Sequence, residues 1–126
     1  MSNMTNDQKR NYVRLEVRIP FEYYVVSDAP AGQETFTAIS KDLSGGGLRF
    51  DSKVELELDT ELELSLDIPK LGKISVGGQV VRCFPLEKVP GYSIGVKFNI
   101  IDKNDRENLI RFIFERQREL RQKGLI

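Results

Sequence analysis

Apolar residues recur at every second position along several stretches of this chain, and this spacing restricts its fold more than any other feature. In residues 61–68 the alternation has no exception, and its apolar positions are Leu62, Leu64, Leu66 and Ile68. A period of two places one face of a β-strand in a core and the other in water. The same spacing, less regular, predicts further strands over residues 15–25, 34–41, 48–50, 73–84 (with a bulge at 77–78) and 92–99.

The end of the chain has a different period. From Asn104 onward the apolar residues follow helical spacing, at Leu109, Ile110, Ile113 and Phe114. Asn104 is predicted as the N-cap, with Glu107 three residues later as in a capping box. Gly124 is predicted to stop the helix, because glycine readily adopts the left-handed conformation that ends helices.

These elements predict the fold class. The 126 residues allow one domain. Several short strands followed by a single helix predict a mainly β protein, a small antiparallel barrel of about six strands with a C-terminal α-helix. We expect a flexible N-terminal arm over residues 1–14, the barrel over 12–101 and the helix over 102–124. Alternation assigns four aromatic side chains to the core, Phe36, Phe50, Phe84 and Phe98.

Charge and composition exclude several classes of function. The chain has 19 Lys+Arg against 19 Asp+Glu and no His. A zero balance disfavours a generic nucleic-acid or membrane binder, although it says nothing about a small basic patch. The lack of His removes the commonest general base and metal ligand. A single cysteine, Cys83, forms no internal disulfide and is expected as a small buried hydrophobe.

Other enzyme signals are also weak. An acidic run resembles a metal or catalytic cluster, but it alternates with leucine and is better interpreted as a solvated strand face; its members are Glu55, Glu57, Asp59, Glu61, Glu63 and Asp67. The chain has no phosphate-binding loop motif. No apolar run approaches the length of a membrane span, and the polar start lacks a secretory h-region. We therefore predict a cytoplasmic protein that is not an enzyme, holds no metal or cofactor and does not insert into a membrane.

Two short motifs remain. Arg10 and Arg14 form R-x-x-x-R, and 28 residues after Arg14 begins D-x-S-x-x-G, with Asp42, Ser44 and Gly47. Alone, the first motif is compatible with a solvated basic arm and the second with a turn in which Asp and Ser cap backbone N–H groups. Residues 42–47 are predicted as a tight loop, since glycine tolerates the positive φ that such a loop needs.

Together, the motifs resemble the PilZ domain family of bacterial receptors for cyclic di-GMP. That family has R-x-x-x-R ahead of its barrel and [D/N]-x-S-x-x-G after the second strand. Tyr12 and the runs Gly-Gly-Leu-Arg-Phe at 46–50 and Gly-Val-Lys-Phe at 95–98 add to the resemblance, which extends over residues 9–124. The resemblance implies a barrel with a following helix and cyclic di-GMP as the ligand.

The resemblance also implies roles for individual residues. Arg10 and Arg14 would contact guanine and phosphate, Asp42 and Ser44 would recognise a guanine, and Gly47 would shape the loop. Arginine suits this ligand because its planar fork binds phosphate oxygens and the O6/N7 edge of guanine. Further contacts are left open, at Lys9, Gly45, Gly46 and Arg49. For Arg49 an ordinary surface charge is an equal alternative.

We therefore predict a bacterial receptor that changes conformation on binding cyclic di-GMP and regulates an unidentified effector protein. The arm over residues 1–14 would become ordered as the ligand is clamped against the barrel. The main alternative is a PilZ-like module that acts by protein contact without a ligand. An RNA-binding barrel is disfavoured by the lack of a basic face with interleaved aromatics, so neither DNA nor RNA is an expected partner. Ligand stoichiometry, pathway and a homodimer through the terminal helix stay open.

Overall fold

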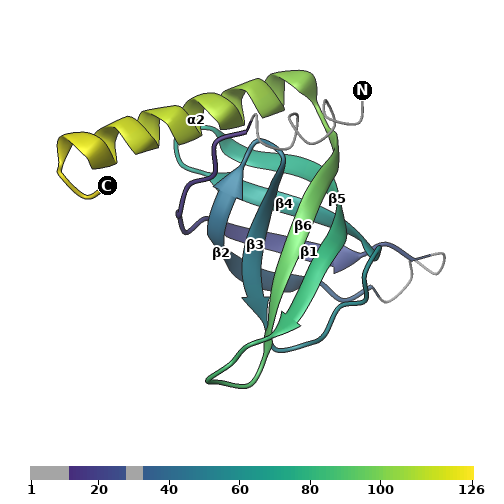
Figure 1. The fold of residues 1–126 in the computed structure, drawn as a ribbon. Helices are drawn as coiled ribbons and strands as arrows, with labels where there is room; N and C mark the ends of the chain where they lie inside the picture. The colour runs from purple at the N-terminus through teal and green to yellow at the C-terminus, as the bar shows by residue number, and fades with distance from the viewer. Residues whose placement is uncertain (1–11, 28–32) are drawn as a thin grey trace, which may run out of the picture.

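An antiparallel barrel forms the body of the molecule in the computed structural model, which describes residues 12–27 and 33–126. Within those ranges six strands close in the order β1-β2-β3-β6-β5-β4 (Figure 1). Their bounds are β1 Pro20–Val25, β2 Phe36–Ser44, β3 Gly47–Ser52, β4 Glu61–Ile68, β5 Gly72–Pro85 and β6 Tyr92–Ile101. Pairing of β1 with β4 closes the barrel. The predicted fold class is confirmed, and β4 has the limits that its alternation indicated.

Alternation along the strands fills the barrel interior. All four apolar side chains of β4 are buried, as are Ile94, Val96 and Phe98 of β6. Phe50 packs edge-on against Phe21 at a centroid distance of 5.1 Å. The core therefore lies inside the barrel, and the outward positions of the same strands are free to carry polar side chains.

Tyr23 is the ionisable side chain of this core. It is 5% exposed and its ring stacks on Phe36. Burial raises the pKa of the Tyr23 phenol above its ordinary value of 10.0, and a hydrogen bond with Ser52 opposes the change. The core thus favours the neutral phenol.

The assignment of Phe84 to the core is wrong, because this side chain is 60% exposed. The cause is a second irregularity in β5. The bulge predicted at residues 77–78 is confirmed, but the register also shifts between Val80 and Arg82. An extra residue on one strand reverses which side chains face inward beyond it. Val80 is buried, and Phe84 points outward.

The predicted loop over residues 42–47 is also wrong. β2 continues to Ser44 and β3 begins at Gly47, which pairs with it, so only Gly45 and Gly46 form the turn. Positive φ angles occur in the described chain at other glycines, not at these three. Leu43, between the motif residues, is fully buried, and this anchors the end of β2 in the core.

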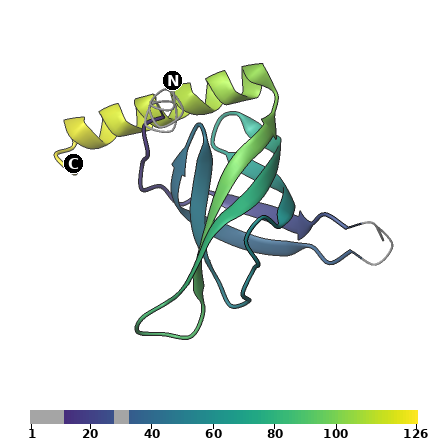
Figure 2. The same ribbon diagram turned by 45° about the vertical axis from the view of Figure 1, so that its right-hand side comes forward.

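Helix α2, Lys103–Gln122, lies across one end of the barrel, and its C-terminal half projects beyond it (Figures 1 and 2). Its N-cap is Asp102, not Asn104 as predicted. The Asp102 carboxylate accepts hydrogen bonds from the backbone N–H groups of Asn104 and Asp105, at 3.0 and 3.2 Å. The cap lies earlier because β6 ends at Ile101, and the helix follows directly.

Two faces of α2 differ in burial. Leu109 and Ile113 are buried against the barrel, whereas Phe114 is 45% exposed. Gly124 ends the helix as predicted, with a φ of 73° and a hydrogen bond from Leu125 N–H to the Leu120 carbonyl. No helix in the described ranges has the length and apolar character needed to cross a membrane.

Candidate functional site

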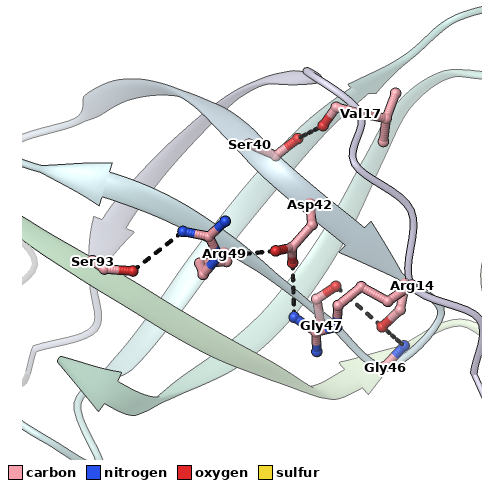
Figure 3. Close-up of polar contacts among 9 residues, drawn as sticks. Arg14, Val17, Ser40, Asp42, Gly46, Gly47, Arg49 and Ser93 are labelled. Atoms are coloured by element: carbon pink, nitrogen blue, oxygen red, sulfur yellow. Dashed lines mark hydrogen bonds and ion pairs between the residues drawn. The ribbon is translucent and has the colours of Figure 1, made fainter. Parts of the chain in front are cut away.

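Asp42 lies at the centre of the candidate site. Its side chain is 9% exposed, and its two oxygens accept from two arginines, Arg14 Nη1 at 2.7 Å and Arg49 Nε at 2.9 Å (Figure 3). Arg49 also donates to the Ser93 hydroxyl at 3.5 Å. Arg14 comes from the segment before β1, and Arg49 from β3. One buried carboxylate therefore orients two cations, whose side chains remain 58% and 39% exposed.

Ser44 stabilises the turn that follows Asp42. Its hydroxyl oxygen accepts from the Gly46 N–H at 3.1 Å, and the hydroxyl donates to the Gly47 carbonyl at 3.4 Å. The residue is 4% exposed. This is the turn-capping role that the sequence left open beside ligand contact. Loss of the Ser44 hydroxyl would therefore remove two hydrogen bonds that hold this turn.

Packing explains the three glycines that follow Ser44. A Cβ at Gly45 would lie 2.7 Å from Ile110 of α2, and one at Gly46 would lie 2.8 Å from the Tyr12 ring. At Gly47 a Cβ would collide with the carbonyl oxygen of Val96 on the neighbouring strand. The turn is thus pressed between Tyr12, the helix and β6, which is why small residues are needed there.

Tyr12 connects the first motif to the helix. The guanidinium of Arg106, on α2, lies 5.6 Å from the centre of the Tyr12 ring and donates to its hydroxyl at 3.3 Å. Arg106 also donates to the Phe98 carbonyl at 3.4 Å. The aromatic residue within R-x-x-x-R therefore lies between the glycine turn of the second motif and the start of α2.

A surface hollow of about 1180 Å³ joins these elements. It contains most of the predicted site residues, namely Arg14, Asp42, Ser44, Gly46, Gly47 and Arg49. Gly45 does not line it and packs against Ile110 instead. Lys9 and Arg10 lie outside the described residues. The structure thus brings the second motif together with the half of the first motif that it describes.

The hollow also contains three cations that sequence reasoning did not select, Arg82, Lys97 and Arg106. Gly95 of β6 lies opposite Arg49 on one side and Arg82 on the other, so these arginines form an outward row across three strands. The stem of Arg82 lies against Gly95, where a Cβ would be 3.1 Å from the Arg82 Cβ. Only strand pairing reveals this row, since Arg49 and Arg82 are far apart in the sequence.

The chemistry of the hollow favours binding of an anion. Its described lining has five cationic side chains and one carboxylate, and that carboxylate is already paired with two arginines. Arginine forks bind phosphate or the acceptor edge of a planar base. Residues 12–27 and 33–126 contain no cluster of His, Cys, Asp and Glu that could hold a metal ion.

Comparison with known proteins gives a family match. The family model for the PilZ domain matches residues 8–115. No curated protein sequence is significantly similar to the chain.

Several solved structures share the fold. Bacillus subtilis MotI/DgrA, an inhibitor of motility, has a TM-score of 0.74 at 20% identity over 87% of this chain and 52% of that one. MrkH of K. pneumonia in complex with c-di-GMP has a TM-score of 0.73 at 20% identity, covering 90% and 55%. Escherichia coli YcgR in complex with c-di-GMP has a TM-score of 0.71 at 21% identity, covering 92% and 49%. The chain spans about half the length of these proteins.

Proposed function

Because this chain belongs to the PilZ domain family, we propose that it is a receptor for cyclic di-GMP and that binding alters its contacts with a partner protein. The observation that carries the proposal is Asp42, a buried carboxylate paired with Arg14 and Arg49 at the edge of a cation-rich hollow. Both arginines stay partly exposed, so each can offer its remaining N–H groups to a ligand while Asp42 fixes its direction.

The charge and the hydrogen-bonding groups of the ligand suit this hollow. Cyclic di-GMP presents two phosphates and two guanines, and arginine can contact either group. The structures of MrkH and YcgR named above were determined with c-di-GMP. We propose corresponding roles here for Arg10 and Arg14 at guanine and phosphate, and for Asp42 and Ser44 at a guanine edge. Lys9, Gly46 and Arg49 are proposed as further contacts, with Gly45 and Gly47 shaping the turn.

Binding would act through the N-terminal segment. Arg14 is fixed by Asp42, and Tyr12 contacts the helix, so a ligand that engages both motif arginines would reposition this segment against α2. A partner protein would read the resulting surface. We propose that the receptor acts in a bacterial cytoplasm, that it neither hydrolyses the ligand nor uses a cofactor, and that its partner is a protein rather than DNA or RNA.

Isothermal titration calorimetry with cyclic di-GMP tests the proposal. The intact chain should bind at micromolar concentration or below. Arg14→Ala should weaken binding about tenfold to a hundredfold, because one arginine contact to a guanine is worth about 1–3 kcal/mol. Arg18→Ala is the matched control, since Arg18 is an exposed arginine four residues away that does not line this hollow.

Two results would contradict the proposal. The intact chain could fail to bind cyclic di-GMP, in which case a ligand-independent interaction module becomes the better description. Alternatively, Arg14→Ala and Arg18→Ala could bind equally well, which would remove the assigned site. Far-UV circular dichroism of each variant checks that the barrel persists.

A further inference from the structure

Arg106 occupies a position that does not favour an arginine on structural grounds. It is the fourth residue of α2, whose N-cap is Asp102. The N-terminal end of a helix carries partial positive charge, which disfavours a cation. No carboxylate among the described residues pairs with Arg106, although Asp102 and Asp105 lie close in sequence. An explanation for this side chain is therefore needed outside the helix.

The contacts that Arg106 makes are long. Its two terminal nitrogens donate to the Tyr12 hydroxyl at 3.3 Å and to the Phe98 carbonyl at 3.4 Å, beyond the usual 2.9–3.0 Å. Its Nε is buried and has no hydrogen-bond partner. A buried donor without a partner is destabilising and rare in folded proteins. The guanidinium thus has only neutral, distant acceptors and unused donor capacity.

The same side chain lines the hollow that contains Arg14 and Asp42. A phosphate oxygen placed there would be a charged acceptor, and charge-assisted bonds to arginine are shorter and about twice as strong as neutral ones. Exchange of the Tyr12 and Phe98 acceptors for a phosphate would therefore strengthen the hydrogen bonds of the guanidinium, in return for its contact with the face of the Tyr12 ring. Such an exchange would also let the buried Nε reorient toward an acceptor.

We propose that Arg106 is an additional ligand-binding arginine, contributed by α2, which leaves Tyr12 and binds a phosphate of the ligand. The inference rests on the proposed function and extends its site from the two motifs to the helix. Because Arg106 belongs to α2, its contact would transmit ligand binding to the helix. Release of the phenol would free Tyr12 at the same time, so arm and helix would respond together.

The experiment compares three variants with the intact chain by calorimetry against cyclic di-GMP. Arg106→Gln should weaken binding about tenfold, as expected for loss of one arginine–anion contact. The affinity of Arg106→Lys should lie between those of the intact chain and Arg106→Gln, because lysine keeps the charge but not the planar fork. Arg111→Gln is the matched control, an exposed arginine on the same helix that does not line the hollow, and should bind like the intact chain.

A fourth variant, Tyr12→Phe, tests whether Arg106 contacts the ligand itself or only holds Tyr12 in place. It removes the internal acceptor of Arg106 and keeps the ring, so it should tighten binding about twofold to tenfold. Affinity equal to or below that of the intact chain would overturn the inference, as would Arg106→Gln binding no more weakly than Arg111→Gln. Failure of the intact chain to bind would instead overturn the proposed function. Thermal unfolding of each variant checks its folding.

Discussion

Two hollows on the outer surface of the barrel differ in the charge of the side chains that line them. The hollow over β1, β2 and β4, about 770 Å³, is lined by three cations and three carboxylates, Arg18, Lys41, Lys73, Glu22, Asp51 and Asp67. Lys41 pairs with Asp51 at 2.6 Å, and Lys73 approaches Glu22 at 3.9 Å. The hollow over β3, β6 and β5 has five cations and one carboxylate in its described lining. The first, the balanced hollow, has equal numbers of cations and carboxylates, whereas the second is cation-rich and offers charges that a ligand could neutralise.

The backbone differs as well. The cation-rich hollow is lined by Gly46, Gly47 and Gly95, whereas none of the described glycines lines the balanced hollow. Glycine within or beside a strand weakens the sheet and is expected where another group approaches the backbone closely. Net charge cannot reveal this difference, because the zero balance of the whole chain averages the cationic face with acidic residues elsewhere in the sequence.

The largest effect is expected at Gly47. A Cβ there meets a main-chain carbonyl, that of Val96, which cannot move without breaking the β3–β6 pairing. Gly47→Ala should lower the free energy of unfolding by about 3 kcal/mol, measured by urea denaturation. Gly46→Ala is the control, since its Cβ meets only the Tyr12 ring, and it should cost clearly less stability. Equal losses of stability in both variants would show that the close approach of β6 is not the reason for a glycine at position 47.

The next largest effect tests the charge comparison directly. Asp42→Asn removes the anion that orients Arg14 and Arg49, so affinity for cyclic di-GMP should fall about tenfold to a hundredfold. The stability loss should be about 1 kcal/mol, because both arginines are partly exposed to solvent. Asp51→Asn makes the same change in the balanced hollow and should leave the affinity within twofold. A comparable loss at Asp51 would mean that the two hollows do not differ in function.

The strands could be predicted because their signal is local. The alternation in residues 61–68 depends only on which face meets the core, so β4 was predicted with its limits. Phe84 and Asn104 were misplaced because their positions depend on distant partners. A register shift against β6 turns Phe84 outward, and the continuation of β6 to Ile101 moves the helix cap to Asp102. Neither the register shift nor the length of β6 can be predicted from the local sequence around Phe84 and Asn104.

The candidate site shows the same limit. Arg14 and Asp42 could be selected because two motifs carry them, and the structure joins them by an ion pair across 28 positions. Arg82 and Arg106 belong to neither motif. Arg82 lines the hollow because β5 pairs with β6, and Arg106 lines it because α2 crosses the end of the barrel. The glycine turn is shorter than the loop predicted over residues 42–47, and its cause also differs, since contact with Tyr12 and Ile110, rather than positive φ, requires small residues at Gly45 and Gly46.

A smaller effect on affinity is expected at Gly95, where the lack of a side chain leaves space for the stem of Arg82. A Cβ at Gly95 would press on the stem of Arg82 and shift its charge relative to Arg49. Gly95→Ala should weaken cyclic di-GMP binding about twofold to fivefold, in the range of a partly solvated charge contact. Ser65→Ala, in the lining of the balanced hollow, is the control by the same titration and should have no effect. If Gly95→Ala binds as the intact chain does, Arg82 contributes nothing to the site.

The smallest effect is expected in the barrel core, which lies beneath both hollows. Tyr23 in this core should change the pH dependence of stability and should not distinguish the two hollows. Burial raises the pKa of Tyr23 above 10.0, so the fold binds the phenolic proton more tightly than the unfolded chain does. This contribution to stability is complete below about pH 10 and is lost as pH rises through the raised value. Tyr23→Phe should therefore lose less stability than the intact chain between neutral and strongly alkaline pH, as followed by urea denaturation. Parallel declines in the two proteins would show that Tyr23 titrates as freely in the barrel as in the unfolded chain.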